Sequence, residues 1–207
     1  MTNPWEKISL SDYEEHMKLQ DIMQLQTLNN IMQNQINQYP VKTITILGIA
    51  GGNGLEYINP EKHDKVYGID INKKYLEICK NRFPILASCL ELKAIDLMDI
   101  NTKLPKSELI IANLLIEYIG VETLIKHMKQ TLPKVISCVI QKNIDQEFVS
   151  SSPYQQAFQD LSSIHTDVHE ELLVECLKTI NYKVIVRKEY LLPNKKMFIR
   201  IDFKMMR

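Results

Sequence analysis

The chain has 207 residues, of which 45% are apolar and 24% are charged, as is typical of a soluble globular protein with one domain and an appendage. Equal numbers of acidic and basic residues give a formal net charge of zero, which weighs against a nucleic-acid partner because such proteins usually carry a basic stripe. No apolar run reaches the ~20 residues that span a bilayer, no targeting peptide is evident, and the four cysteines lack Cys-x-x-Cys spacing, so we expect a cytoplasmic protein with reduced thiols.

Residues 1–40 are predicted to form a helical extension. Trp5, the single tryptophan, is expected to anchor this extension onto the body of the protein. Ser11 and Glu14 have the spacing of a capping box, with Ser11 as the N-cap. Apolar residues then recur every three or four positions opposite a face of Gln and Asn, and Pro40 ends the pattern. The pattern fits one helix or two. Its apolar face predicts packing against the main sheet, and the alternative is a lid over a ligand site; both can hold.

Strand and helix patterns alternate from residue 41 onward, and the strands are apolar without interruption. Such strands are typical of a parallel sheet that is covered by helices on both faces. We expect strands at residues 42–48, 65–70, 90–95, 108–113 and 133–141, and helices at 52–59, 73–82 and 118–131.

The rhythm breaks at residues 142–162, where a polar, turn-forming stretch predicts a functional or mobile loop. A helix is expected at 165–180, followed by strands at 182–191 and 196–204. Because the link between these last strands is short, they must be antiparallel. The predicted fold class is α/β: a Rossmann-like, doubly wound, mostly parallel seven-stranded sheet with an antiparallel C-terminal strand and an N-terminal helical extension.

A glycine-rich turn follows the first of these strands and reads Ile-Leu-Gly-Ile-Ala-Gly-Gly-Asn-Gly over residues 46–54. Glycine has no Cβ and tolerates positive φ, so a ligand can approach the backbone there, beside the N–H groups of a helix start. The pattern predicts a nucleotide-type cofactor site. However, the spacing excludes the G-x-G-x-x-G dinucleotide fingerprint, and the absence of a following Lys-Ser/Thr excludes a P-loop.

Acidic residues follow the next two strands, since Asp70 ends the second and Asp96 follows the third. The carboxyl ends of parallel strands share one edge of a sheet, so the turn, Asp70 and Asp96 are expected to converge on one crevice. Together with the terminal antiparallel pair, these features resemble the class I S-adenosylmethionine-dependent methyltransferases over about residues 41–205. The resemblance implies an S-adenosylmethionine-binding domain at residues 41–207.

The resemblance also implies a role for individual residues. Laid without gaps on the family's hydrophobic-acidic-hydrophobic-G-x-G-x-G pattern, Ala50, Gly52 and Gly54 take the three glycine positions, which face the methionine and ribose portions of the cofactor. Asp70 takes the place of the acid that holds both ribose hydroxyls, and Asp96 that of the acid near the adenine amino group. The predicted cofactor-binding residues are Gly48, Ala50, Gly51, Gly52, Gly54, Asp70, Ile71, Asp96, Leu97 and Asn113.

Two positions depart from the family pattern, because Gly48 replaces the usual acid and Ala50 replaces the first glycine. The missing acid normally helps to orient the methionine amino group. Asp12 or Glu15 of the N-terminal extension is a hypothetical substitute. The departures leave open whether the cofactor is used productively.

The residues after the fourth strand, Asn-Leu-Leu-Ile-Glu-Tyr over 113–118, lack the Asn/Asp-Pro-Pro-Tyr/Phe signature of enzymes that methylate base or glutamine amino groups. Glu117, Tyr118 and His165 are substrate-side candidates, and the alternative for Glu117 and Tyr118 is that they only begin a helix. His165 and His169 are spaced for a metal pair on a helix, but no third ligand is evident, so no metal is predicted.

The sequence therefore predicts a methyltransferase that acts on a small molecule, as a monomer or homodimer, with no catalytic residue assigned. One alternative is methylation of RNA or a protein side chain. The other is a non-catalytic S-adenosylmethionine-binding protein.

Overall fold

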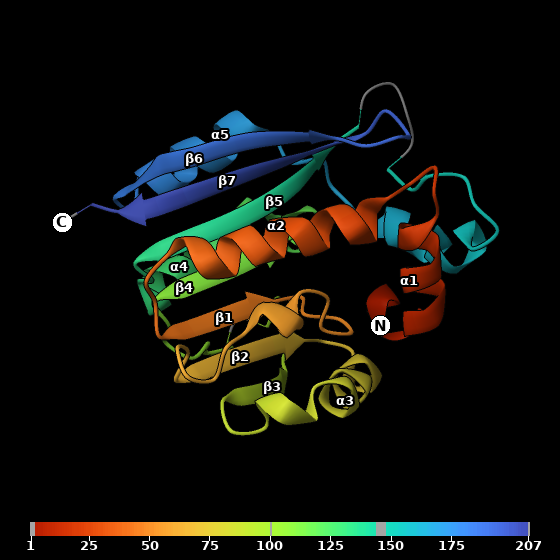
Figure 1. Ribbon diagram of the computed structural model, residues 1–207. Coiled ribbons are helices and arrows are strands. Elements are labelled where there is room, and N and C mark those ends of the chain that lie inside the picture. Colours follow the sequence, from red (N-terminus) through yellow and green to blue (C-terminus); the bar gives the residue numbers. More distant parts are fainter. Residues whose placement is uncertain (1–2, 100, 144–147, 207) are drawn as a thin grey trace.

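The structure of the chain is a computed structural model and describes residues 3–99, 101–143 and 148–206. Seven strands form one sheet with the order β3-β2-β1-β4-β5-β7-β6 (Figure 1). β7 runs antiparallel to both of its neighbours, and the other pairs are parallel, as predicted. The strands are Thr43–Leu47 (β1), Lys65–Asp70 (β2), Leu90–Ala94 (β3), Leu109–Asn113 (β4), Val135–Lys142 (β5), Tyr182–Leu191 (β6) and Met197–Met205 (β7).

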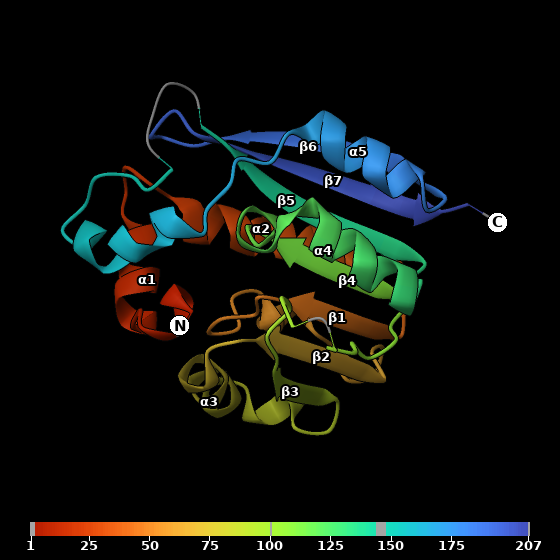
Figure 2. The same cartoon turned by 180° about the vertical axis from the view of Figure 1, so that it is seen from behind.

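Helices cover both faces of this sheet, which explains why its central strands are apolar without interruption. α2 crosses one face beside α3, and their apolar side chains share a core with alternate residues of β1, β2 and β4 (Figure 1). α4 and α5 cover the other face (Figure 2). The helices are Leu10–Lys18 (α1), Gln24–Gln38 (α2), Lys73–Arg82 (α3), Ile116–Thr131 (α4) and Glu170–Lys178 (α5), with shorter 3₁₀ helices at Pro4–Glu6 (η1), Leu55–Tyr57 (η2), Pro84–Leu86 (η3) and Gln155–Ser163 (η4).

The N-terminal extension forms two helices that meet at a turn, because Met23 adopts a left-handed conformation with φ of 54°. The predicted N-cap was wrong by two residues. Ser9, not Ser11, caps α1, and its hydroxyl accepts a hydrogen bond of 3.0 Å from the Asp12 N–H. A Ser-x-x-Asp spacing satisfies a free N–H group of the first turn as well as the Ser-x-x-Glu spacing that the sequence also offers.

The helix predicted at residues 52–59 does not form, and only the single 3₁₀ turn η2 is present there. Gly52 and Gly54 both adopt positive φ, at 89° and 92°, so the backbone turns instead of propagating a helix. α2 packs over this segment, and a Cβ on Gly54 would lie only 2.5 Å from the Cβ of Met32. The long N-terminal helix therefore occupies the place of the expected helix.

The helix predicted at residues 165–180 begins only at Glu170, and His165 and His169 lie before it. They are therefore not one helical turn apart, and the proposed geometry for a metal pair is absent. The predicted loop at 142–162 contains the first part of η4, and its residues 144–147 lie outside the described part of the chain.

The four cysteines are all unpaired, and three of them are buried, as expected for reduced thiols. Within the described residues, no helix combines the length and the apolar character that crossing a bilayer requires.

Candidate functional site

The parallel strands point their carboxyl ends toward α1 (Figure 1). A pocket lies between these ends and the N-terminal segment. It lies where the chain leaves β1 and β4, the adjacent strands whose connections run in opposite directions along the sheet. Ligands of open α/β sheets bind at such a point. The pocket holds about 730 Å³ counted out to the solvent. We call it the first pocket.

The first pocket brings together most of the predicted cofactor residues, although they come from four different strand ends. Its lining includes Gly48, Ala50, Asp70, Ile71, Asp96, Leu97 and Asn113. Gly51, Gly52 and Gly54 lie outside it and shape the turn from behind. Gly52, for example, faces the α3 side, where an added Cβ would lie 2.7 Å from the Phe83 ring.

Asp70 ties the glycine-rich turn to the end of β2. Its Oδ2 accepts the Ala50 N–H at 2.9 Å, and its Oδ1 accepts the Asn72 N–H at 2.9 Å. Burial raises the pKa of this carboxyl above its usual value, against the effect of these backbone hydrogen bonds. Each carboxylate oxygen has two lone pairs, so both retain capacity toward the pocket. Ala50 has a left-handed φ of 47°, a strained conformation for a residue with a Cβ.

Asp96 and Leu97 lie at the opposite wall of the first pocket. Asp96 is exposed at the rim, and its Oδ1 accepts the Met98 N–H at 2.8 Å. Leu97 is buried, and its carbonyl oxygen lies 2.9 Å from Nε2 of His127 on α4, which fixes this wall against the core.

The glycine at position 48, where the family pattern has an acid, has a local structural cause. Gly48 adopts a φ of 68°, and a Cβ there would lie 3.3 Å from Cδ1 of Leu115. A carboxylate side chain at this position would be strained in its backbone and crowded by Leu115. The positive φ and the contact with Leu115 therefore disfavour the acid that the family pattern places at this point.

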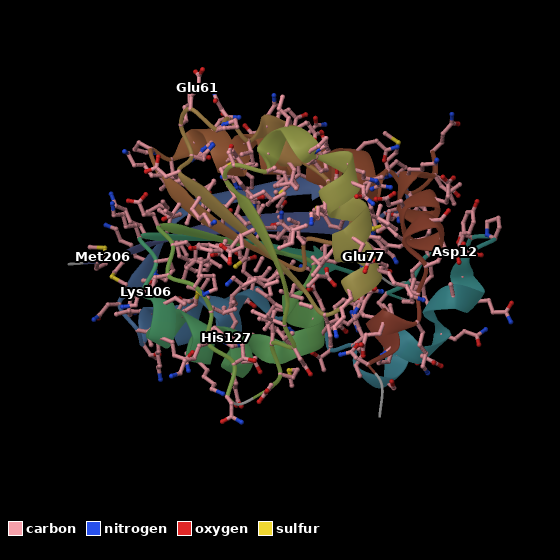
Figure 3. All side chains as sticks on the ribbon, turned by 90° about the horizontal axis from the view of Figure 1, so that it is seen from below. Asp12, Glu61, Glu77, Lys106, His127 and Met206 are labelled. Carbon is pink, nitrogen blue, oxygen red and sulfur yellow. The ribbon has the colours of Figure 1, made fainter. Side chains whose placement is uncertain are left out.

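The hypothetical substitute acids, Asp12 and Glu15, do not line any of the pockets that border the turn. Asp12 lies on the side of α1 away from the sheet (Figure 3), and Glu15 is paired with Lys18. Glu14 is the acid at the turn. It lines a smaller cavity that shares Gly48 and Ala50 with the first pocket.

α2 packs against the sheet as predicted, and the residues before it border the first pocket; that they act as a lid stays a prediction. Trp5 and Tyr13 line the pocket, and the ring centroids of Trp5 and Tyr118 lie 5.0 Å apart in an edge-on arrangement. Two hydrogen bonds fasten the segment to α3: Tyr75 OH donates to the Ile8 carbonyl at 3.0 Å, and Asn72 Nδ2 donates to the Trp5 carbonyl at 2.9 Å. Glu14 pairs with Arg82 of α3 as a third link.

Gly51 sits directly beneath α1, and Gly51→Ala is expected to loosen α1. An added Cβ would lie 2.5 Å from both Nη1 of Arg82 and Oε1 of Glu14, and 2.8 Å from Leu10. The ends of Arg82 and Glu14 must move to admit the methyl group, which disturbs the ion pair that links α1 to α3. Hydrogen exchange measured by mass spectrometry should show faster exchange in α1 while the central strands are unchanged. Lys80→Ala, at an exposed position on α3, is the control, and equal α1 protection in both variants would contradict the prediction.

A second pocket adjoins the first and shares Trp5, Tyr13, Leu114 and Tyr118 with it. We call it the aromatic pocket; it holds about 540 Å³ counted out to the solvent. The remaining lining residues come from α1, α2, α4, β5 and the segment around η4, and they are His16, Met17, Gln24, Glu117, Gln141, Phe148, Val149, Phe158, Leu161 and His165.

Two of the three predicted substrate-side residues lie in the aromatic pocket alone, and Tyr118 lies in both pockets. Glu117 is 3% exposed, and its Oε1 accepts the Gln141 N–H at 2.8 Å. Burial raises the pKa of its carboxyl to about 7. His165 stacks on Phe148 with ring centroids 4.0 Å apart, and burial lowers its pKa.

Among the described residues, no three His, Cys, Asp or Glu side chains are grouped so that they could hold a metal ion.

No protein-family model and no curated protein matches this sequence. Solved structures do match the fold. The N-methyltransferase NodS from Bradyrhizobium japonicum WM9, in complex with S-adenosylhomocysteine, has a TM-score of 0.64 at 12% identity, over 96% of this chain and 98% of its own. Magnesium protoporphyrin IX methyltransferase from Synechocystis PCC 6803 has a TM-score of 0.62 at 10% identity, over 89% of this chain and 83% of its own.

The chain has the class I S-adenosylmethionine-dependent methyltransferase fold. This methyltransferase fold alone does not fix a reaction. The [4+2]-cyclase SpnF matches equally well, with a TM-score of 0.64 at 8% identity, over 89% of this chain and 82% of its own. Function must therefore be argued from the residues of the site.

Proposed function

We propose that this protein is an S-adenosylmethionine-dependent methyltransferase that acts on a small molecule. The observation that carries the proposal is the convergence of the Ala50 turn, Asp70 and Asp96 on one pocket that shares four lining residues with a second, aromatic one. The first would hold the cofactor, and the second would hold the methyl acceptor.

The donor set of the first pocket fits the cofactor. The Asp70 carboxylate would accept hydrogen bonds from the two ribose hydroxyls, and Asp96 at the rim would accept one from the adenine amino group. The apolar side chains of Ile71, Ile95 and Leu97 would border the adenine ring. When bound, S-adenosylmethionine supplies a methyl group on a positively charged sulfur, which a nucleophile can displace.

The residues of the chain then have to orient an acceptor, exclude water and receive a proton. Alignment is the main requirement for a displacement of this kind. Trp5 and Tyr13 border both pockets, so their rings would help to keep water from the point where cofactor and acceptor meet.

A small-molecule acceptor is favoured over RNA or protein by the walls of the aromatic pocket. α1 and η4 enclose it, and none of its described lining residues is Lys or Arg. A nucleic-acid substrate would require basic side chains along its path. Calorimetry with S-adenosylmethionine, followed by a methyl-transfer assay with a pool of small metabolites, distinguishes an enzyme from a protein that only binds the cofactor.

Asp70→Ala is expected to weaken S-adenosylmethionine binding at least tenfold. The change removes charge-assisted hydrogen bonds, which are worth about 1.5–3 kcal/mol. Isothermal titration with S-adenosylmethionine and S-adenosylhomocysteine measures the effect. Asp64→Ala provides the control, because Asp64 is a surface residue near Lys42 and far from the pocket. Absence of binding by the unaltered protein would remove the proposal, and so would equal affinity in the two variants.

A further inference from the structure

The aromatic pocket has walls suited to a positively charged group. Trp5, Tyr13, Tyr118, Phe148 and Phe158 contribute ring surface from four separate segments of the chain. Aromatic faces attract cations through their quadrupole, and this attraction is strongest where water is excluded. Apolar side chains of η1, α1 and η4 pack together along this wall and shield part of the pocket from water.

The charged side chain that lines the aromatic pocket favours a cation. The described lining contains one carboxylate, Glu117, and no Lys or Arg. Lys196 does not line the pocket, but its ammonium, which donates to the Phe148 carbonyl, keeps its positive charge and acts on His16 and His165. Burial lowers the pKa of His16 to about 4 and also lowers that of His165, so both imidazoles are neutral near pH 7.

Glu117 presents a free acceptor at the inner end of this pocket. Its Oε1 accepts the Gln141 N–H, whereas its buried Oε2 has no hydrogen-bond partner among the described residues. A buried oxygen without a partner is costly, so this acceptor is available to a group bound in the pocket.

The backbone on either side of Glu117 adopts positive φ, which is strained at Leu114 because leucine carries a Cβ. Leu114 has a left-handed φ of 52°, and Gly120 interrupts α4 with a φ of 76°. Strained backbone of this kind persists where the surrounding structure enforces it, often at functional sites. The turn between these two residues carries both Glu117 and Tyr118 and presents them side by side to the pocket.

We propose that the aromatic pocket binds a small amine on an apolar or aromatic skeleton, and that Glu117 receives the proton that the amine loses before methylation. The second part rests on the proposed function. The bound ammonium passes one proton to the Glu117 carboxylate, and its freed lone pair forms the bond to the methyl carbon. The bond from that carbon to sulfur breaks with its electron pair kept on sulfur, and the proton leaves Glu117 for water.

This assignment gives the unusual environment of Glu117 a chemical role. A general base is most effective when its pKa lies near the working pH. An ordinary carboxylate is too weak a base to take a proton from an ammonium, and burial makes Glu117 a stronger one.

The test compares ligands of equal skeleton. Trp5 is the only tryptophan and borders both pockets, so its fluorescence reports binding. A panel of aryl- and alkylamines, led by 2-phenylethylamine, is titrated beside the carboxylic acid and the alcohol of each skeleton, led by phenylacetate and 2-phenylethanol. At pH 8 we expect the amines to bind at least tenfold more tightly than either counterpart. A panel without this preference overturns the inference.

Two further arms test Glu117 itself. In the unaltered protein, the amine affinity should fall about tenfold from pH 8 to pH 6, because Glu117 takes up a proton and loses its charge. The other groups that face it are His16 and His165, whose pKa values are lowered, Tyr13 and Tyr118, whose pKa values are raised, and the charged Asp167 and Lys196. Glu117→Gln should lose the amine preference at pH 8 as well. Equal amine affinity at the two pH values overturns the inference, and this arm requires no variant to fold.

Calorimetry with S-adenosylmethionine separates the inference from the proposed function. Cofactor binding without a preference for amines overturns the inference alone. Amine preference without cofactor binding confirms the amine site and removes both the proposed function and the role of Glu117 in methylation.

Discussion

Asp202→Ala is expected to lower the free energy of unfolding by about 3–5 kcal/mol, as measured by urea denaturation. Asp202 and Arg200 are both fully buried on β7, where they form an ion pair. Removing one member of a buried pair leaves an uncompensated charge in the interior. The loss is larger than for any exposed pair, since those contribute about 0–1 kcal/mol.

The Asp202 carboxylate also organises a polar network beneath α2. It accepts hydrogen bonds from the Tyr39 and Ser137 hydroxyls as well as from Arg200. Gln35 of α2 continues the network, because its Nε2 donates to Ser137 at 2.8 Å and to Asn113 at 2.9 Å. Asn113 lines the first pocket, so the network connects β7, α2 and the pocket wall.

A matched control uses the same substitution at the surface. Asp160 pairs with Lys7 at 3.0 Å, with side chains that are 63% and 60% exposed, and Asp160→Ala should cost less than about 1 kcal/mol. Replacing both members of the buried pair, as Arg200→Met with Asp202→Leu, should recover much of the loss, because no charge is then left buried. Equal costs for Asp202→Ala and Asp160→Ala would show that the network contributes little.

This network also shows a limit of reading α2 from its sequence. The pattern of apolar residues predicted the helix and its packing correctly, but its Gln and Asn residues resembled a solvated face. Gln24 and Gln35 are in fact buried, and Gln24 donates to Gln141 of β5 at 2.6 Å. The spacing of apolar residues shows which face of a helix is apolar, but it cannot show that a polar residue has a partner on a distant strand.

The first pocket was more predictable because its geometry follows from local rules. A turn after β1 and acids after β2 and β3 must meet at one edge of a parallel sheet. The glycines behind the turn were harder to place, because the positive φ of Gly52 and Gly54 stops the helix that residues 52–59 otherwise favour. What replaces that helix is α2, which is remote in sequence.

The aromatic pocket was predictable only in part. Glu117, Tyr118 and His165 were candidates by their position relative to β4 and the loop, but Tyr13 and Phe158 were not identified. Their contribution depends on how η1, α1 and η4 fold over the carboxyl ends of the strands (Figure 2). The single tryptophan near the start of a polar segment was the one signal that pointed to this contact.

The free energy of unfolding of Glu117→Gln, relative to that of the unaltered protein, is expected to rise by about 3 kcal/mol from low to high pH. Burial raises the pKa of Glu117 from 4.5 in the unfolded chain to about 7 in the folded protein. At 1.36 kcal/mol for each pH unit, this difference corresponds to about 3 kcal/mol. Below pH 4.5 the carboxyl is neutral in both states. As the pH rises through 7, the unfolded chain ionises first, so the folded protein loses this stability.

Urea denaturation of both proteins at pH 4.5, 6 and 8 measures this effect, since other titrating groups cancel between them. The glutamine variant should gain stability relative to the unaltered protein as the pH rises, and parallel pH profiles would show that Glu117 ionises without cost.

A structural role does not explain a carboxylate that destabilises the fold near neutral pH, because glutamine has the same shape and would be more stable there. Functional sites commonly retain such a cost because activity depends on it. A variant that is more stable at pH 8 and has lost its preference for amines would therefore identify Glu117 as a residue retained for binding and proton transfer.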